Sequence, residues 1–486
     1  MTAILRRLVT ILALLQPMLL VQRPIAAQSP GEKDPVLEIT EERVRAAYAD
    51  SLAACAKSFG KALEPAVPLA FVGTKELAEV IARENLELVK LRQPDAEKAA
   101  AEAEQLGRQL AAVAYAKYSW ADGRFLVALD NWSKNVKLLD MPELASDATL
   151  RAVMVHELCH AYDDRRFSLA DRLLTADTND AVMALNAVIE GSAQLQTRKV
   201  CAQNGWGEGF AAMREAVGKV PTSVTKQGEA LAMLARATAS GMQFAYYDGE
   251  TFVAAVVAAD ADNGLERSFR EPPRDPETII NPAWYLDPAK RPAILYDPEP
   301  ALDRLEADYD DTWNRVRVKS TAQQLASGLT LLPKEEVEAF LPTVRNVRIV
   351  QLNPKRAPQS KAVIGAVLEF DGEASAARWI EMSDRLSKRK DEAMATGRLR
   401  IVGSSTTPLT EPDLRGYLQR KQMKLGRSEF EVASIDVQRG RVVVETILSG
   451  EPLEDEAHRQ LVREMMDAVF TKGEAKPTED GQTRDK

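Results

Sequence analysis

The feature that most constrains this chain is the segment Val155-His156-Glu157-Leu158-Cys159-His160. The 486 residues contain only three histidines, and two of them lie four positions apart in this segment. On an α-helix, residues four apart point from one face, so both imidazoles can bind a single metal ion. Glu157 lies one position on, where its carboxylate can reach a water on the metal's open side and act as a general base. The spacing therefore predicts a helix that carries a metal centre, and the ligand types favour zinc.

A zinc centre that performs chemistry needs three protein ligands and one open position. The third histidine, His458, falls in a helix-like segment far along the chain, and we expect it to be a surface residue. Cys159 points away from the face that His156 and His160 share, so we expect a small buried hydrophobic residue. A carboxylate must therefore complete the ligand set.

Glu190 is the best candidate for that carboxylate. It lies thirty positions after His160, within the otherwise apolar stretch AVMALNAVIEGSA. Buried acids usually have partners, and the small Gly191 and Ala193 allow a second helix to approach closely. The alternative is a glutamate that caps or solvates an exposed helix face.

In these motifs the chain resembles the gluzincin class of zincin metallopeptidases, in which a HExxH helix and a glutamate from a following helix hold zinc. It is more closely similar to a group of exported bacterial proteins with the patterns HExxHAxxDxxF and EGxA, matched here by HELCHAYDDRRF (156–167) and EGSA (190–193). Further similarity occurs at residues 246–253, 272–277, 281–282 and 285. The resemblance covers roughly residues 115–290, and the group usually has a histidine where this chain has Asn281.

The resemblance implies an α+β fold with a mostly helical zincin core, in which a strand near residues 124–129 lines the cleft and pairs with an extended peptide. It implies that His156, His160 and Glu190 hold Zn²⁺, and that Glu157 is the general base of an exported zinc metallopeptidase. The alternatives are a catalytically silent zincin-like binding or assembly protein with a structural zinc, and an enzyme that hydrolyses a different amide, such as one in cell-wall material.

Two supporting roles are left open by departures from the family pattern. Thermolysin-like enzymes have an aspartate four residues after the ligand glutamate, but Gln194 stands there. Asp164 or Asp163 could instead orient a ligand, or could pair with a neighbouring arginine. No histidine remains to stabilise an oxyanion, so we assign that role to Tyr246 or Tyr247, of which Tyr246 aligns better with the family's tyrosine. The alternative for both tyrosines is packing.

Residues 1–27 have the order of a secretory signal peptide: two arginines, an apolar run, and small residues before a polar segment, with cleavage expected near Ala27. An uncleaved anchor is the alternative. Removal of this segment leaves 60 basic and 72 acidic residues, a net charge of −12. We therefore expect a secreted or periplasmic protein with a peptide or protein substrate, no nucleic-acid partner and no stable membrane insertion after cleavage. Cys55 and Cys201 could pair in an oxidising compartment.

The pattern along the chain predicts a zincin-like domain over residues 28–330, including N-terminal helices, and a separate small α+β domain of unknown role over 334–470. In the first domain we expect helices at 38–64 and 74–117, a strand or hairpin at 118–129, and helices at 152–162, 180–195 and 251–261. Ser146 or Asp147 can cap the helix that runs through 152–162, and Asp180 can start the helix that runs through 195. Residues 271–300 are rich in proline and are expected to be a non-helical loop.

In the second domain the expected strands are 362–370, 399–402 and 429–447, and the expected helices are 373–394, 411–424 and 453–470. A break near residues 327–333 marks the boundary between the domains. The polar residues 471–486 are expected to be a disordered tail.

Overall fold

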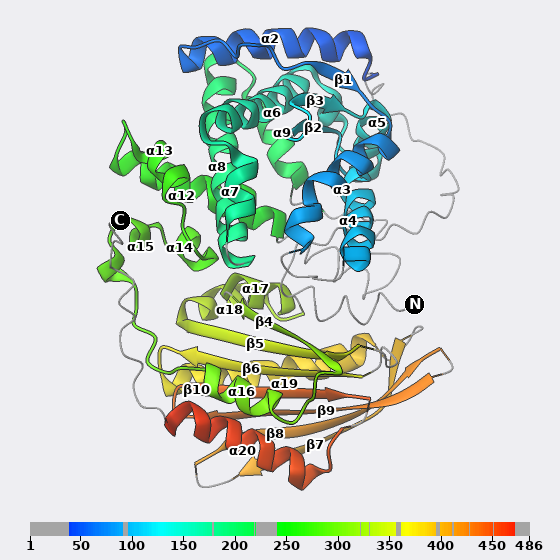
Figure 1. Cartoon of the computed structure of the whole chain (residues 1–486), viewed down its shortest axis with the longest axis vertical. Helices are drawn as coiled ribbons and strands as arrows, with labels where there is room; N and C mark the ends of the chain where they lie inside the picture. The colour runs from blue at the N-terminus through cyan, green and yellow to red at the C-terminus, as the bar shows by residue number, and fades with distance from the viewer. Residues whose placement is uncertain are drawn as a thin grey trace. The chain divides into compact units, whose positions relative to one another are not determined.

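A computed structural model describes residues 38–90, 96–176, 179–217, 219, 241–320, 322–329, 331–355, 361–394, 399–410, 413–426, 428–450 and 452–471. They have an α+β fold and form two compact units that divide between Pro288 and Ala289 (Figure 1). The signal-peptide prediction lies outside the described residues, as does the tail prediction beyond Thr471. Among the described residues, no helix is both long and apolar enough to cross a membrane.

The first unit is mostly helical, with one small sheet. Its elements are α2 (Glu41–Phe59), β1 (Leu69–Phe71), α3 (Thr74–Lys90), α4 (Ala96–Ala111), β2 (Ala116–Ser119), β3 (Arg124–Val127), α5 (Leu129–Leu139), η1 (Pro142–Ala145), α6 (Asp147–Phe167), α7 (Leu169–Thr175), α8 (Asn179–Asn204), α9 (Gly207–Val217), the π-helical turn η2 (Phe244–Asp248), α12 (Gly249–Ala259), α13 (Gly264–Arg270), α14 (Pro276–Ile280), α15 (Pro282–Leu286) and η3 (Pro288–Lys290).

Helix α6 contains the HELCH segment; it begins at the predicted cap and continues beyond residue 162 to Phe167. Ser146 is its N-cap and accepts a hydrogen bond from Thr149 N at 3.2 Å, which satisfies one of the free amides of the first turn. The helix ends at Ser168, whose φ of 54° turns the chain into α7. Because Leu150, Met154 and Leu158 are fully buried, α6 forms the centre of the unit's core.

The predicted hairpin at 118–129 is confirmed as β2 and β3, joined by a turn in which Gly123 adopts a φ of 61°. The sheet order is β1-β3-β2, with β1 parallel to β3 and β2 antiparallel to it. The central strand is therefore β3, and β2 is the edge strand that contacts α6. The expectation that the strand near residues 124–129 pairs with an extended peptide was wrong, because β3 already pairs with β1 on one side and β2 on the other.

Two glycines let helices of the first unit cross at very short range. A Cβ on Gly191 of α8 would lie 2.2 Å from the carbonyl of Gly249, and a Cβ on Gly249 would lie 2.1 Å from Ala187 O. Only glycine fits at such a crossing. It brings η2 and the start of α12 directly against the segment of α8 that contains Glu190, as the expectation for Gly191 required.

The proline-rich segment 271–300 is not the continuous loop that we predicted, since it contains α14, α15 and η3. Proline cannot continue a helix, but it fits at the first position, where its missing N–H is not needed. Pro276 and Pro282 occupy this position in α14 and α15. Asp275 caps α14 by accepting a hydrogen bond from Thr278 N at 3.0 Å.

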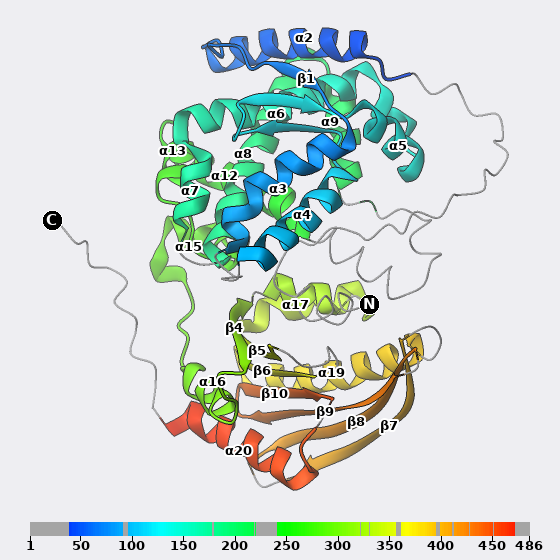
Figure 2. The same cartoon turned by 45° about the vertical axis from the view of Figure 1, so that its right-hand side comes forward.

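The second unit is a seven-stranded antiparallel sheet of order β4-β5-β6-β10-β9-β8-β7, with helices on both faces (Figure 2). Its elements are α16 (Glu299–Glu306), β4 (Trp313–Ser320), α17 (Ala322–Gly328), α18 (Lys334–Phe340), η4 (Leu341–Thr343), β5 (Val344–Pro354), β6 (Ala362–Phe370), α19 (Glu373–Ala393), β7 (Leu399–Thr410), β8 (Arg415–Leu425), β9 (Ser428–Arg439), β10 (Val442–Ser449) and α20 (Asp455–Thr471).

Alternation along the strands divides this sheet into two apolar faces. In β10, Val442 and Val444 pack in a cluster with α16 and α20, whereas Val443 packs with α17, α18 and α19. The same alternation in β6 separates Val367 from Leu368. Because α16 and β4 belong to this unit, it begins about forty residues before the expected break near 327–333.

Several expected elements of the second unit are confirmed and others were wrong. The strand at 362–370 and the helices at 373–394 and 453–470 correspond to β6, α19 and α20. The helix expected at 411–424 is instead β8, which pairs with β7 and β9 along its length. The strand expected at 399–402 extends to Thr410, and the one expected at 429–447 is two strands joined at Gly440, with a φ of 55°.

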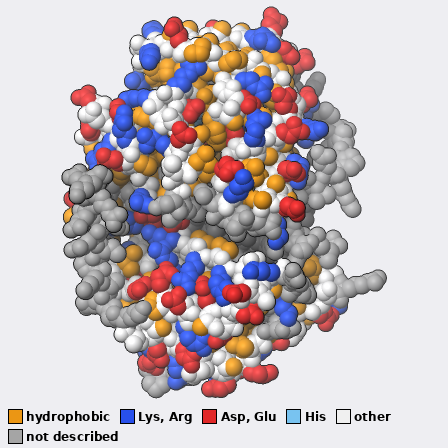
Figure 3. Space-filling model, in the orientation of Figure 1, with side chains coloured by type: hydrophobic (Ala, Val, Ile, Leu, Met, Phe, Trp, Pro, Cys, Tyr) orange, Lys and Arg blue, Asp and Glu red, His pale blue; other side chains and the backbone are white. Residues whose placement is uncertain are grey.

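The expectation that His458 is a surface residue was wrong. It is fully buried in α20, where its Nε2 lies 2.7 Å from Thr446 Oγ1 of β10. All three cysteines are buried and free, so Cys55 and Cys201 form no disulfide in this structure. On the face shown in Figure 3, acidic, basic and apolar side chains of the described residues are interspersed.

Candidate metal centre

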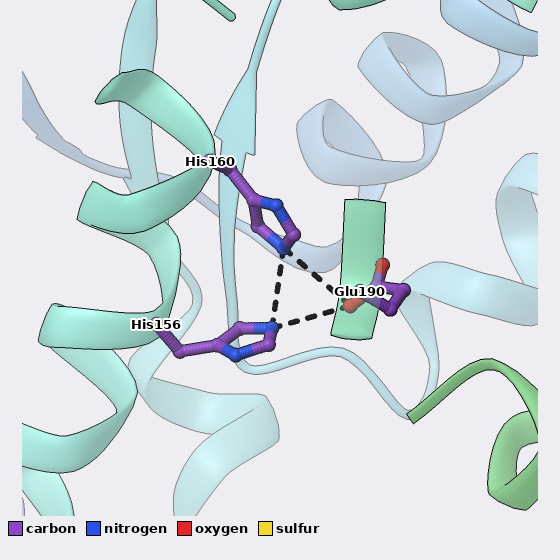
Figure 4. A group of neighbouring side chains, drawn as sticks. All are labelled: His156, His160 and Glu190. Atoms are coloured by element: carbon purple, nitrogen blue, oxygen red, sulfur yellow. Dashed lines mark hydrogen bonds and ion pairs between the residues drawn. The ribbon is translucent and has the colours of Figure 1, made fainter. Parts of the chain in front are cut away.

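His156, His160 and Glu190 converge at one point between α6 and α8. His156 Nε2 and His160 Nε2 are 3.2 Å apart, and they lie 3.3 and 3.5 Å from Glu190 Oε2. Figure 4 shows both imidazoles projecting from one helix toward the carboxylate. The potential ligand atoms all lie within 4.8 Å of one another, and among the described residues this is the group that could hold a metal ion.

The chemistry of these atoms fits a bound cation. The side chains of His156, His160 and Glu190 are only 5, 12 and 17% exposed. Glu190 Oε2 is buried and receives no hydrogen bond, although two imidazole nitrogens face it. An ionised, unsatisfied oxygen in such a place is costly without a counter-charge. Two imidazoles and a carboxylate are ligands that first-row divalent metals accept.

The charges at the centre shift the pKa values of two of the candidate ligands. Burial opposes ionisation of Glu190, but the adjacent imidazoles hold the pKa of its carboxyl well below the usual range. Burial alone would lower the pKa of His160, whereas the carboxylate of Glu190 raises it above its ordinary value. The carboxylate of Glu190 and the ring of His160 therefore stabilise each other electrostatically.

Glu157 lies near enough for its charge to act on His160, but it is not part of the group of three potential ligands. Its Oε2 accepts a hydrogen bond of 2.6 Å from the backbone N–H of Tyr118 in β2. Since β2 is an edge strand, this amide points away from β3 and toward α6. The carboxylate is therefore held between the helix and the strand edge, beside the candidate centre.

Tyr246 and Tyr247 differ in their surroundings. The Tyr246 ring lies parallel to that of His156, with centroids 5.6 Å apart and an interplanar angle of 15°. Burial, followed by the charges of Glu190 and Glu157, raises the pKa of its phenol well above the ordinary value. Tyr247 instead donates to the carbonyl of Arg214 and lies under that arginine's guanidinium. Only Tyr246 of the two is placed at the centre.

Neither aspartate considered for ligand support hydrogen-bonds a ligand histidine. Asp163 accepts from Ser192 Oγ at 2.7 Å and from Gln196 Nε2 at 3.3 Å, and it links α6 to α8. Asp164 accepts from the Tyr118 phenol at 2.9 Å. The Nδ1 atoms of both histidines are buried without a hydrogen-bond partner. Cys159 is fully buried in the core, as predicted.

Lys117 is a charged neighbour that the sequence did not single out. Its ammonium lies 3.0 Å from Glu84 Oε2 and 4.4 Å from the centre of the Trp120 ring. Burial lowers its pKa, but Glu84, Glu157 and Glu190 together raise it above the ordinary value. Lysine in a strand carries no signal of its own, and only the fold brings β2 beside the HELCH helix.

No family model matches the chain, and no curated protein matches it. Solved structures give remote likenesses. A candidate hydrolase with a novel fold from Chloroflexus aurantiacus is 19% identical with a TM-score of 0.34, over 52% of this chain and 90% of that one. The extracellular domain of PknH from Mycobacterium tuberculosis is 11% identical with a TM-score of 0.24, over 36% of this chain and 93% of that one. Likeness at this level carries no argument about function.

Proposed function

We propose that this chain is an exported zinc metallopeptidase of gluzincin type, in which His156, His160 and Glu190 bind zinc. One observation carries the proposal: the two imidazoles and the carboxylate, from two different helices, meet within 4.8 Å while Glu157 lies beside them. Three protein ligands with one adjacent free carboxylate are typical of a catalytic centre, since structural zinc usually has four protein ligands.

The residues around the centre supply the remaining parts of a hydrolytic mechanism. A zinc ion bound there would supply Lewis acidity, which polarises a carbonyl and makes a water molecule more acidic. Glu157 accepts the proton from that water and passes it to the nitrogen of the leaving amine. The Tyr246 phenol, whose raised pKa keeps it protonated, donates a hydrogen bond to the developing oxyanion.

The edge of β2 supports a peptide rather than a compact substrate. An edge strand presents backbone groups outside its sheet, and those of β2 that α6 does not use, unlike the amide of Tyr118, could pair with an extended peptide. Because Tyr118 N–H reaches Glu157, a peptide lying along β2 would pass beside the general base. The signal-peptide pattern of residues 1–27 supports export of the enzyme, so its substrates would be secreted or periplasmic proteins.

The proposal is tested with the purified chain, Glu157→Gln and Glu190→Ala. We measure zinc by elemental analysis and cleavage with a peptide library. The wild type should hold one zinc per chain and cleave peptides; Glu157→Gln should keep the zinc and lose at least about a thousandfold in kcat. Cleavage by Glu157→Gln at the wild-type rate would exclude Glu157 as the base. Zinc retention without cleavage of any peptide by the wild type would favour a silent zincin-like binding protein.

A further inference from the structure

Tyr118 is bound to α6 at two points that are seven residues apart. Its backbone N–H donates to Glu157 Oε2 at 2.6 Å, and its phenol donates to Asp164 Oδ2 at 2.9 Å. We propose that Tyr118 is a positioning residue: the phenol, anchored on Asp164, fixes β2 against α6 and thereby presents the amide that orients Glu157. In its catalytic meaning this inference rests on the proposed function.

The spacing of the two contacts explains why they act together. Residues seven apart lie on one stripe of a helix, separated by roughly 10 Å along its axis. Glu157 and Asp164 therefore define a line on α6, and Tyr118 spans that line with its amide at one end and its phenol at the other. The tyrosine is only 6% exposed. A rotation or a slide of β2 along α6 would break at least one of the two hydrogen bonds.

Strand β2 needs such an anchor because it is held weakly by its own sheet. It has four residues, Ala116–Ser119, and it pairs with β3 on one side only. A short edge strand makes few ladder hydrogen bonds, and its local opening costs little free energy. The Tyr118 phenol adds a tertiary contact to α6.

Asp164 is itself held in place, which makes it a fixed acceptor. Its second oxygen, Oδ1, accepts a hydrogen bond of 3.0 Å from Leu169 N. That amide follows Ser168, whose left-handed backbone (φ 54°) ends α6 and starts α7. The carboxylate thus joins the end of the HELCH helix, the start of the next helix and the strand edge.

Orientation of Glu157 follows from this arrangement. A glutamate has several accessible rotamers, and a base that leaves its working position by about 1 Å can cost about a hundredfold in rate. The amide of Tyr118 selects the rotamer in which Oε2 lies against β2, beside the three ligand side chains. If the phenol is lost, β2 is less constrained and this rotamer is less populated.

Tyr118→Phe removes the phenol contact and keeps the ring, and Tyr162→Phe is its matched control. Tyr162 lies on α6, and like Tyr118 it donates a phenol hydrogen bond of 2.9 Å, but its acceptor is Lys61 O. For each full-length chain we measure zinc content, kcat and KM on one cleaved peptide, and the hydrogen-exchange rate of the residue-118 amide. Asp164→Asn tests the same contact from the other side should Tyr118→Phe fail to fold.

We expect Tyr118→Phe to retain its zinc, to lose about tenfold or more in kcat with KM within about twofold, and to exchange the residue-118 amide at least about tenfold faster. Tyr162→Phe should match the wild type in all of these. An unchanged exchange rate or an unchanged kcat in Tyr118→Phe overturns the inference. If the wild type cleaves nothing yet exchange accelerates in Tyr118→Phe, the positioning contact stands and the proposed peptidase function fails.

Discussion

The two units of this protein both place acidic side chains next to a helix and away from solvent, but the partners of these side chains differ. In the second unit, Asp436 of β9 accepts hydrogen bonds from the Tyr417 phenol at 2.6 Å and from Ser383 Oγ at 2.7 Å, and Glu445 of β10 accepts from the Trp379 indole of α19. In the first unit, Glu190 Oε2 and both histidine Nδ1 atoms have no hydrogen bond.

The difference shows which kind of buried charge indicates a site. The carboxylates beside α19 have donors from the protein, and they hold the helix on the sheet in the manner of any satisfied polar core. At the candidate centre, His156 Nε2 and His160 Nε2 lie 3.2 Å apart and both face Glu190 Oε2, which receives no hydrogen bond. Convergence of two imidazoles on a carboxylate oxygen that receives no hydrogen bond therefore marks a group that could bind a cation, whereas burial of a carboxylate alone does not.

The largest effect should come from breaking the ligand set. Glu190→Ala removes one of three ligands, so we expect its zinc affinity to fall by more than about a hundredfold, as measured by competition with a chromophoric chelator. Glu445→Gln, which alters a buried carboxylate of the second unit, should leave zinc affinity unchanged. Equal affinity in Glu190→Ala and wild type would remove the distinction between the two kinds of carboxylate.

The helix crossing beside the centre is the next most sensitive feature. Gly249→Ala would place a Cβ 2.1 Å from Ala187 O, so α8 and η2 must separate and Tyr246 must move away from His156. We expect a loss of about 1–3 kcal/mol in the free energy of unfolding and at least about a tenfold loss in kcat. Gly73→Ala, where no atom lies within 4 Å of the added Cβ, serves as the control in thermal unfolding and kinetics. Similar losses of stability and kcat in Gly249→Ala and Gly73→Ala would show that the close helix crossing is not needed for either property.

The acid Glu445 of the second unit should affect stability without affecting the candidate metal centre. Burial, and then the charge of Asp436, raises the pKa of Glu445 to about 8. The folded state keeps a proton that the unfolded chain releases above about pH 4.5, so stability falls as pH rises between these values. Glu445→Gln should therefore unfold at higher urea than the wild type at pH 8, with a smaller difference at pH 5. Glu338→Gln, at an exposed site, should show no such trend.

His458 should give the opposite pH trend, smaller than that of Glu445 because its pKa shift is smaller. Burial, and then the charge of Arg420, lowers its pKa to about 4. The unfolded chain binds a proton below about pH 6.5 that the folded state excludes, so stability falls by up to roughly 3 kcal/mol as pH drops from 6.5 to 4. In His458→Gln, whose side chain can still contact Thr446, the free energy of unfolding measured with urea should depend less on pH between 6.5 and 4. A wild-type stability that is constant over this range would contradict the neutral buried histidine.

The convergence of His156, His160 and Glu190 could be predicted because helix geometry fixes much of it locally. The four-residue spacing of His156 and His160 gives a common face on any α-helix, and Glu190 stands out as an acid among apolar residues. The role of Tyr118 could not be predicted, because alternation along a strand does not tell which strand is the edge of its sheet. That depends on topology, here the order β1-β3-β2.

The side chains of β8 show why this strand was mistaken for a helix in the sequence. Tyr417 and Gln419 are buried polar residues that hydrogen-bond to Asp436 and to Ser387 of α19, so one face of the strand is polar although it is covered. The alternation of apolar and polar residues that identifies strands is therefore missing. His458 could have been recognised, since Leu461, Val462 and Met465 continue its buried stripe at helical spacing.

The π-helical turn η2 has a consequence for the length of the chain around Tyr246. Such a turn contains one residue more than an α-helical turn, so it acts as a one-residue insertion in the helix that leads into α12. Deleting Tyr247 would restore α-helical register and rotate Tyr246 and the residues before it by roughly 100° relative to α12. Tyr246 would then no longer lie beside His156, even with every site residue retained. Tolerance to insertion and deletion should therefore be lower in this turn than in the helices on either side of it.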